Sequence, residues 1–244
     1  MMAVVCLVSF LTGQATAGEF QRQQVAYPRV RAAFAAHEGA LRAQFENTGA
    51  TWPPRDLVFR VFKSNAVLET WARARSADTL VRVRSDHICA SSGWLGPKRH
   101  AGDGQVPEGF YEVAGFNPTS QYHLALLVSY PNASDRILGQ APLGGDIMIH
   151  GDCVTIGCIP LTDPVIEQIY AAAVAARDAG QERIQVQIFP ARFPADGLGP
   201  MLQLAGTPAI RRFWANLQQG DRRFLSTRRP LEFTVDGAGS YVFR

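Results

Sequence analysis

The chain has 244 residues, of which 47% are hydrophobic and 18% are charged, so it is long and apolar enough to bury a core. Its formal net charge is only +3, and its arginines are scattered along the sequence instead of forming one basic run. The composition therefore predicts a globular protein and gives little support to a nucleic-acid-binding protein.

The first 17 residues form a short apolar segment with the small-x-small ending Ala15-Thr16-Ala17, and we expect a signal peptide cleaved near Ala17. No Lys or Arg precedes the apolar stretch, so a retained anchor and a buried N-terminal helix stay open as alternatives. No other stretch is long enough to cross a bilayer, so no membrane span is expected in the mature chain. A periplasmic or secreted location would allow a cysteine pair to form a disulfide.

A helical lead-in is expected over residues 18–54. Apolar side chains recur at roughly helical spacing within residues 28–46, and they are Val30, Phe34, Leu41 and Phe45. Residues 56–63 then alternate as in a strand. A short helix is expected around residues 67–74, and a strand around residues 80–84.

Turn residues dominate the middle of the chain. Residues 91–107 are rich in Gly, Pro and Ser, which predicts a long loop. Strand-like runs follow at 110–114, 122–129 and 146–150, separated by Asn-Pro, Pro-Asn and Gly-Gly pairs. Such closely spaced strands predict an α+β protein with a mainly β core, a barrel or a sandwich, and flanking helices.

The clearest helix is expected over residues 164–178. Asp163 can cap it, Pro164 suits its first position, and Gly180 lies just beyond its end. A strand over 184–188 follows.

A second helix is expected near residues 208–218, with Thr207 as its cap and Gly220 as its stop. Residues 231–235 and 241–243 have the pattern of a terminal hairpin. We therefore assign the main domain to residues 55–199, and a C-terminal helix with terminal strands that pack on it to residues 200–244.

Residues 144–160 carry the chemistry. An apolar strand leads to His150, a loop of small residues follows, and Gly157-Cys158 closes it shortly before a helix. A thiol is a weak nucleophile until an imidazole takes its proton, and a positive histidine or a helix N-terminus lowers its pKa. We predict Cys158 as the nucleophile and His150 as its base. A backbone carbonyl would fix the tautomer, and the amides of Gly157 and Cys158 would form an oxyanion hole.

Spacing alone leaves two other interpretations open. His150, Cys153 and Cys158 could be metal ligands, or the two cysteines could form a disulfide. Only three candidate ligands gather there, and no CxxC pair supports a closed zinc site. We therefore predict no metal and no organic cofactor.

Several linked motifs occur in order over residues 55–243. His150-Gly151 precedes Thr155-Ile156-Gly157-Cys158, and the other motifs are residues 92–98 (Ser-Gly-Trp-Leu-Gly-Pro-Lys), 102–104, 107–111, 117–118, 130–132, 135–136 and 189–190. Together they resemble the YkuD-like L,D-transpeptidases, and in particular the YafK-like branch of murein proteins.

The resemblance implies a peptidoglycan-modifying enzyme that forms an acyl-enzyme on stem peptides. Cys158 would attack a peptide carbonyl, His150 would act as base and then as acid, and the carbonyl of Gly151 would orient the imidazole. Thr155 would make a hydrogen bond beside the active site. Two positions depart from typical members, which have histidine where this chain has Ile156 and arginine where it has Pro160.

These departures leave the acyl acceptor open. An amine acceptor would give cross-linking, whereas water would give hydrolysis, including an amidase that cuts between diaminopimelate and a wall-linked lipoprotein. A catalytically inactive wall-binding module is a further alternative.

The resemblance also suggests a role for the remaining cysteines and for two cations. Cys89 resembles a cysteine of some relatives, and its pairing with Cys153 would leave Cys158 free. Lys98 and Arg136 are candidates to bind substrate carboxylates. His87, His100 and His123 are expected at the surface or in the core, and the protein is expected to be a monomer.

Overall fold

The computed structural model describes residues 18–193 and 206–244. The predicted signal peptide, residues 1–17, lies outside the described residues, as does the predicted domain boundary at residues 199 and 200. The division into lead-in, catalytic domain and C-terminal segment stays a prediction.

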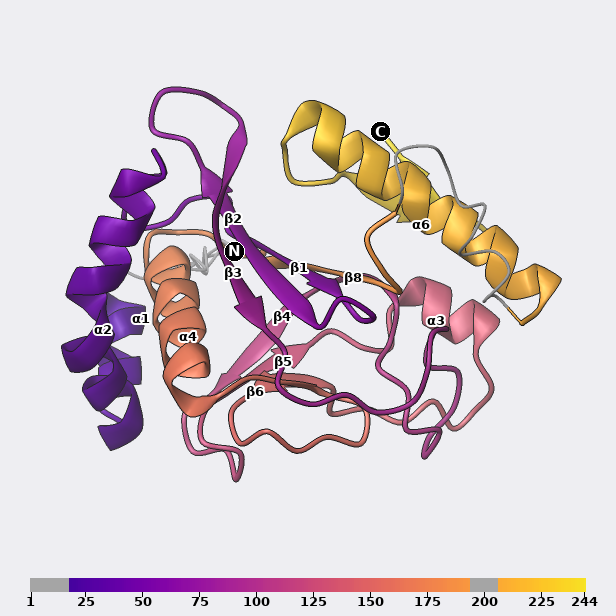
Figure 1. Cartoon of the computed structure of the whole chain (residues 1–244), viewed down its shortest axis with the longest axis horizontal. Coiled ribbons are helices and arrows are strands. Elements are labelled where there is room, and N and C mark those ends of the chain that lie inside the picture. Colours follow the sequence, from indigo (N-terminus) through magenta and orange to yellow (C-terminus); the bar gives the residue numbers. More distant parts are fainter. Residues whose placement is uncertain (1–17, 194–205) are drawn as a thin grey trace, which may run out of the picture.

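A mixed sheet forms the centre of the molecule, with strand order β3-β2-β1-β8-β4-β5-β6-β7, and it curls as it crosses the molecule (Figure 1). Its strands are β1 Val58–Phe62, β2 Val67–Arg73, β3 Leu80–His87, β4 Gly109–Asn117, β5 Ala125–Val128, β6 Met148–His150, β7 Ile159–Pro160 and β8 Gln185–Phe189. A separate hairpin joins β9 Phe233–Val235 to β10 Tyr241–Phe243.

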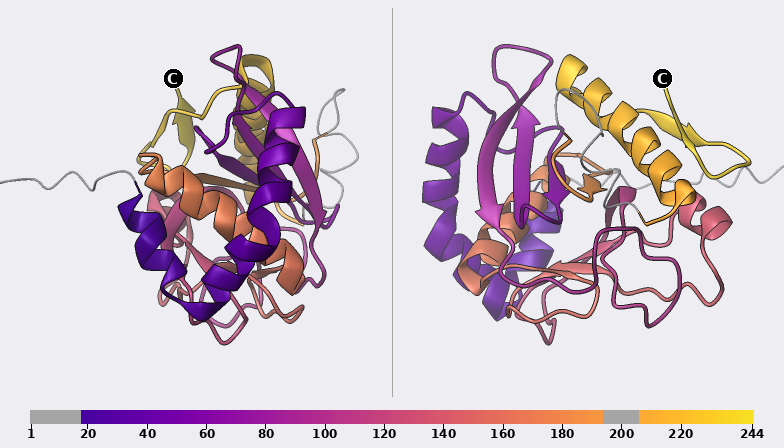
Figure 2. Two further views of the ribbon diagram at one scale, coloured as in Figure 1. Left: turned by 90° about the vertical axis from the view of Figure 1, so that its left-hand side faces the viewer. Right: turned by 45° about the vertical axis from the view of Figure 1, so that its right-hand side comes forward.

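Helices cover both faces of this sheet. They are α1 Glu19–Val25, α2 Pro28–Asn47, α3 Ala133–Leu138, α4 Asp163–Asp178 and α6 Pro208–Thr227. Helices α1, α2 and α4 pack together on one side of the sheet, whereas α6 and the hairpin lie on the other side (Figures 1 and 2). The prediction of an α+β protein with a mainly β core and flanking helices is confirmed.

Strand β1 shows how the two faces are filled. Phe59 and Val61 belong to the core beneath α2 and α4, whereas Val58 and Phe62 belong to the core beneath α6. Successive side chains of a strand point to opposite faces, so β1 supplies both cores. Burial of its apolar side chains on both sides fixes this strand at the centre of the sheet.

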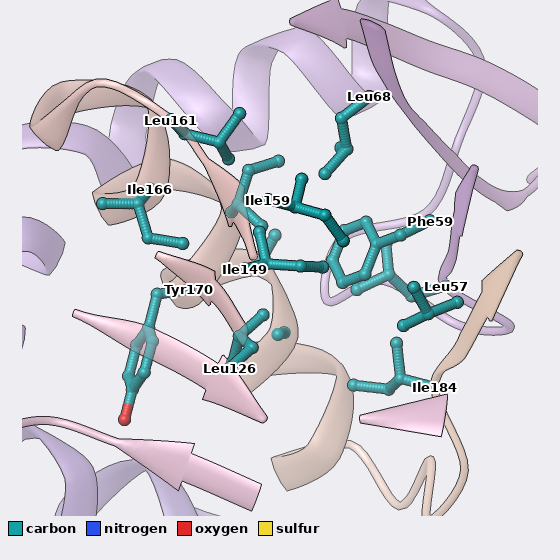
Figure 3. Close-up of a cluster of buried hydrophobic side chains, with 14 of the residues drawn as sticks. Leu57, Phe59, Leu68, Leu126, Ile149, Ile159, Leu161, Ile166, Tyr170 and Ile184 are labelled. Atoms are coloured by element: carbon teal, nitrogen blue, oxygen red, sulfur yellow. The ribbon is translucent and has the colours of Figure 1, made fainter. Parts of the chain in front are cut away.

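The first core also anchors the strands that carry the predicted catalytic residues. Ile149 of β6 and Ile159 of β7 are 0% and 1% exposed, and they point into the cluster of buried side chains shown in Figure 3. The two strands are short, so this burial is what holds them in place.

The helix expected around residues 67–74 is wrong, because these residues form β2. The segment contains helix-favouring Leu, Glu and Ala, but it pairs with both β1 and β3. Its residues Leu68, Thr70 and Ala72 are fully buried on one face. Pairing on two sides outweighs the weak local preference for helix.

Two predicted helix ends also differ. The cap of α4 is Thr162, and Asp163 stands in the first turn, where its carboxylate accepts from the backbone N–H of Asp152 at 2.9 Å. Thr207 caps α6 as predicted, but Gly220 lies inside the helix. A Cβ at Gly220 would lie 2.4 Å from Phe110, so glycine is needed there for close packing.

No helix within residues 18–193 and 206–244 combines the length and the hydropathy needed to cross a bilayer.

Candidate active site

Strands β6 and β7 bring His150 and Cys158 to the same part of the sheet. The strands are parallel, with Ile149 opposite Ile159 and His150 opposite Pro160. Ile149 and Ile159 point into the core, and side chains alternate along a strand. By this alternation the side chains of His150 and Cys158 point to the opposite face, and the register sets Cys158 opposite Met148, two residues before His150.

The imidazole of His150 is 1% exposed, and its Nδ1 lies 2.5 Å from the carbonyl oxygen of Gly151. A carbonyl only accepts, so Nδ1 carries the proton and Nε2 keeps its lone pair. Burial lowers the pKa of His150, while the Gly151 hydrogen bond and the charge of Asp152 act in the opposite direction. The ring is neutral near pH 7, which is the form that a general base needs.

Gly151 is fixed on both sides. Its N–H donates to the carbonyl oxygens of Tyr122 and Leu124 at 3.0 and 3.2 Å. A Cβ at this position would lie 2.5 Å from Oδ1 of Asp163 and 2.9 Å from Cβ of His123. Only glycine fits here, so the carbonyl that faces His150 has a defined place.

Cys89 and Cys153 are joined by a disulfide, and their Cα atoms lie 5.5 Å apart. Cys158 is the free cysteine of the described residues. The alternative disulfide between Cys153 and Cys158 is therefore wrong. In the described part of the chain, no three His, Cys, Asp or Glu side chains are grouped so as to hold a metal ion.

Burial favours the protonated form of the Cys158 thiol. The thiol lies 3.6 Å from the carbonyl oxygen of Asp146, and no hydrogen bond joins it to His150 among the described residues. Burial raises the pKa of Cys158 and the Asp146 carboxylate adds to this, whereas the Met148 backbone and the charge of Lys98 act in the opposite direction. Burial is therefore the dominant influence on the pKa of this thiol.

The loop before Cys158 is organised by Thr155. Its hydroxyl accepts from the N–H groups of Gly157 and Cys158 at 3.1 and 2.8 Å, and donates to the carbonyl of Cys158 at 2.9 Å. These two amides were expected to form an oxyanion hole, but here they are engaged by Thr155. Both N–H groups point at the Thr155 hydroxyl oxygen. An oxyanion could take the place of that oxygen only if the hydroxyl moves away.

Gly157 has a φ of 141°, which a residue with a Cβ rarely adopts. A Cβ there would also lie 3.1 Å from the carbonyl oxygen of Gln105. Glycine therefore lets the Cys158 loop approach the loop of residues 91–107 closely.

A pocket of about 470 Å³ opens beside Cys158. Its walls come mainly from the loop of residues 91–107 and the turn after β1, and they include Val61, Ile88, Trp94, Leu95, Val106 and Ile159. Lys63 also lines it, but its ammonium donates to the carbonyls of Gly96 and Val106 and to Glu108. Lysine has three N–H donors, so this cation is fully engaged and the pocket is largely apolar.

Comparison with known proteins identifies the family. The YkuD family, described as the L,D-transpeptidase catalytic domain, matches residues 61–188. The chain is also 35% identical over 185 residues to "Putative L,D-transpeptidase YafK" of Escherichia coli (strain K12), a match that covers 75% of this chain and 72% of that protein. The chain belongs to the YkuD family of L,D-transpeptidases.

Solved structures resemble this L,D-transpeptidase-family protein more distantly. They include the helical cell shape determining protein Pgp2 from Campylobacter jejuni, at 20% identity and a TM-score of 0.45, covering 62% of this chain and 56% of that one. The L,D-transpeptidase of Xylanimonas cellulosilytica matches at 12% identity and a TM-score of 0.35, covering 57% of this chain and 63% of that one. This chain covers less than two thirds of either of those chains.

The two positions at which the sequence was expected to depart from the family lie beside Cys158. Ile156 is 89% exposed. Pro160 is buried in β7 opposite His150. Neither side chain can bind or protonate a substrate through a charged group.

The structure gives different surroundings to the two predicted carboxylate-binding cations. Lys98 is 6% exposed, and it donates to Asp103 at 2.7 Å and to the carbonyl of His100 at 2.9 Å. Although Lys98 is paired with Asp103, its positive charge lowers the pKa of the Cys158 thiol. Arg136 is exposed on α3 and does not line the pocket beside Cys158.

Sequence reasoning missed two residues around His150 and the loop that follows it. The ring of Tyr122 lies against the imidazole, with the centroids 4.6 Å apart. Asp163, expected only as a helix cap, accepts from the backbone of Asp152 just after Gly151. Neither contact follows a sequence period, because each joins segments that only the folded sheet brings together.

Proposed function

We propose that this protein modifies peptidoglycan through a cysteine acyl-enzyme formed on a stem peptide. The observation that carries the proposal is the placement of one free thiol beside a pocket, on the same face of the sheet as an imidazole whose Nε2 can accept a proton. Membership of the L,D-transpeptidase family supports a cell-wall substrate.

The proposed reaction transfers an acyl group in two steps. The proton of the Cys158 thiol passes to Nε2 of His150 as the sulfur attacks the substrate carbonyl. The amide bond then breaks, and the leaving amine takes that proton, which leaves a thioester on Cys158. In the second step His150 deprotonates an incoming amine or water, which attacks the thioester and releases the thiol.

Substrate binding is the event that would bring the two groups together. In this structure the thiol faces the Asp146 carbonyl and both groups are neutral. A substrate that fills the adjacent pocket would displace water and turn the thiol toward the ring. Catalytic hydrogen bonds often tighten only in the substrate complex.

Transfer and hydrolysis differ only in which nucleophile reaches the thioester. Transfer would make a cross-link between stem peptides. Hydrolysis would shorten a stem, or as an amidase release a wall-linked lipoprotein or peptide from diaminopimelate.

The second candidate is a wall-binding module that has the fold but no turnover. The observation that favours it is the protonated thiol, which makes no hydrogen bond to His150 among the described residues. Both candidates place the protein in the periplasm or outside the cell, acting as a monomer. The Cys89–Cys153 disulfide supports such an oxidising compartment.

The test is incubation of the full chain with defined muropeptides, followed by mass spectrometry of the products. A new cross-link identifies a transferase, and a shortened or released peptide identifies a hydrolase. Cys158→Ala should abolish either product, and His150→Ala should nearly do so, because the two groups act as one unit. Unchanged products in Cys158→Ala would refute the proposal, and pelleting with the wall without any product would identify the binding module.

A further inference from the structure

Tyr122 contacts both the ring of His150 and the peptide that orients that ring. The two ring centroids are 4.6 Å apart, and the planes are inclined by 34°. The carbonyl oxygen of Tyr122 accepts from the N–H of Gly151 at 3.0 Å, and the carbonyl of Gly151 faces Nδ1 of His150 at 2.5 Å. One residue therefore limits the tilt of the imidazole and fixes the group that selects its tautomer.

We propose that Tyr122 is a positioning residue for His150, and that a carboxylate shared by two histidines, Glu167, holds Tyr122 in place. The inference rests on the proposed function, since it gives a role to a residue that touches the base of that reaction. It extends that function to residues that no catalytic motif contains.

The residue after Tyr122 is held in an unusual conformation. His123 has a φ of 66°, which a residue with a Cβ keeps only where its surroundings hold it. Its Nε2 lies 2.7 Å from Oε1 of Glu167, and Oε2 of Glu167 lies 2.8 Å from Nε2 of His37. Each histidine therefore makes its own hydrogen bond to one carboxylate oxygen of Glu167.

The anchor extends beyond the region that matches the family. Glu167 belongs to α4, but His37 and Arg29 belong to α2, which precedes residue 61. Arg29 donates to the carbonyls of Ser120 and His123 at 2.7 and 2.8 Å. Ser120 in turn accepts from the backbone N–H of Tyr122 at 3.0 Å. Helix α2 is thus tied to the segment that packs on the catalytic base.

Removing the Tyr122 ring should have two effects on His150. Without the tyrosine ring, the imidazole could leave the orientation in which Nδ1 faces Gly151. Water could also reach the face of the imidazole that Tyr122 covers. Burial is the main cause that lowers the pKa of His150, so exposure should move this pKa upward. Replacing Tyr122 leaves Asp152 unchanged, and the charge of Asp152 raises the pKa of His150. It also leaves the Cys158 thiol on the same face unchanged.

The test compares Tyr122→Leu with Tyr122→Phe in the full chain. Phenylalanine keeps the ring, and the Tyr122 hydroxyl has no hydrogen bond to any described residue, so Tyr122→Phe should behave as the wild type. Tyr122→Leu should raise the pKa of His150 and mix its two tautomers, both read from NMR shifts of the ring nitrogens. Its kcat on muropeptides should fall on the order of tenfold or more while KM stays unchanged.

A second pair of variants tests the anchor, and it keeps the inference testable if Tyr122→Leu fails to fold. Glu167→Ala should lower kcat and disturb the His150 tautomer in the same way. Glu46→Ala, the same change at an exposed position of α2, should leave both unchanged.

The positioning role is overturned if Tyr122→Leu and Glu167→Ala keep the single His150 tautomer, its pKa, and kcat within about twofold of the wild type. The proposed function fails separately, if the wild type has no turnover or Cys158→Ala retains it. In that case the NMR measurements still decide whether Tyr122 positions the ring.

Discussion

Replacing Gly151 by alanine should damage both stability and turnover. A Cβ at this position would lie 2.5 Å from Oδ1 of Asp163, 2.9 Å from Cβ of His123 and 3.1 Å from Cγ2 of Ile166. Real Cβ atoms essentially never come closer than 3.0 Å, so α4 or the loop must shift. Overpacking of this kind costs about 1–3 kcal/mol.

This cost should be visible in thermal unfolding. Each kcal/mol lowers Tm by about 2–4 °C in a chain of this size, so a fall of about 2–12 °C is expected. Turnover should fall on the order of a hundredfold, because the displaced peptide carries the carbonyl that orients His150.

The matched control is Gly39→Ala. Gly39 is exposed in the middle of α2, and a Cβ added there would meet nothing within 4 Å, so alanine should stabilise the helix by about 0.5–1 kcal/mol and leave turnover unchanged. Wild-type turnover and Tm in Gly151→Ala would refute the argument that the close packing of Gly151 supports the base.

Three further predictions follow from the same site. Thr155→Val should unfold more easily, because two amides lose their acceptor at about 1–3 kcal/mol each, whereas Thr155→Ser should keep the wild-type stability. Equal stability of the two variants would contradict the role of the hydroxyl. Replacing Cys89 and Cys153 together by serine should lower the free energy of unfolding in urea by up to about 4 kcal/mol, because the disulfide spans 64 residues. An unchanged free energy of unfolding would show that the disulfide does not constrain the unfolded chain. The acid limb of the pH profile of kcat/KM should lie below the usual histidine pKa of about 6.5. Burial lowers the pKa of His150, and this base works only when it is neutral. An acid limb at or above about 6.5 would count against His150.

The proposed catalytic pair could be selected from sequence because its chemistry is local. His150 ends an apolar strand, and Gly157-Cys158 follow after a short loop, so one stretch of sequence contains both groups. The long helix α4 and the alternating strand β8 were also predictable, because each follows a clear hydrophobic period.

Residues whose role depends on contacts distant in sequence were not predictable. Tyr122 reaches His150 only because β5 pairs with β6, with Ala125 opposite His150. Gly220 appeared to end a helix, but it is required where α6 crosses Phe110. No sequence period records these contacts, since each depends on how separate elements pack.

The pKa of the Cys158 thiol also depends on the fold. A cysteine near a histidine suggests a lowered pKa, but the outcome depends on burial and on which form the histidine takes. Burial raises the pKa of Cys158 and lowers that of His150, so both groups are neutral. The two groups can be identified in the sequence, but their protonation states depend on the burial that the fold imposes.

The central claim is that the sulfur of Cys158 carries the acyl group, and the most direct test is to trap that intermediate. The protein would be mixed with an acyl-donor muropeptide, quenched in acid, digested and mapped by mass spectrometry. The account predicts a thioester adduct on the peptide that contains Cys158, and none in Cys158→Ala. Product formation without this adduct, at the same rate in Cys158→Ala, would contradict it.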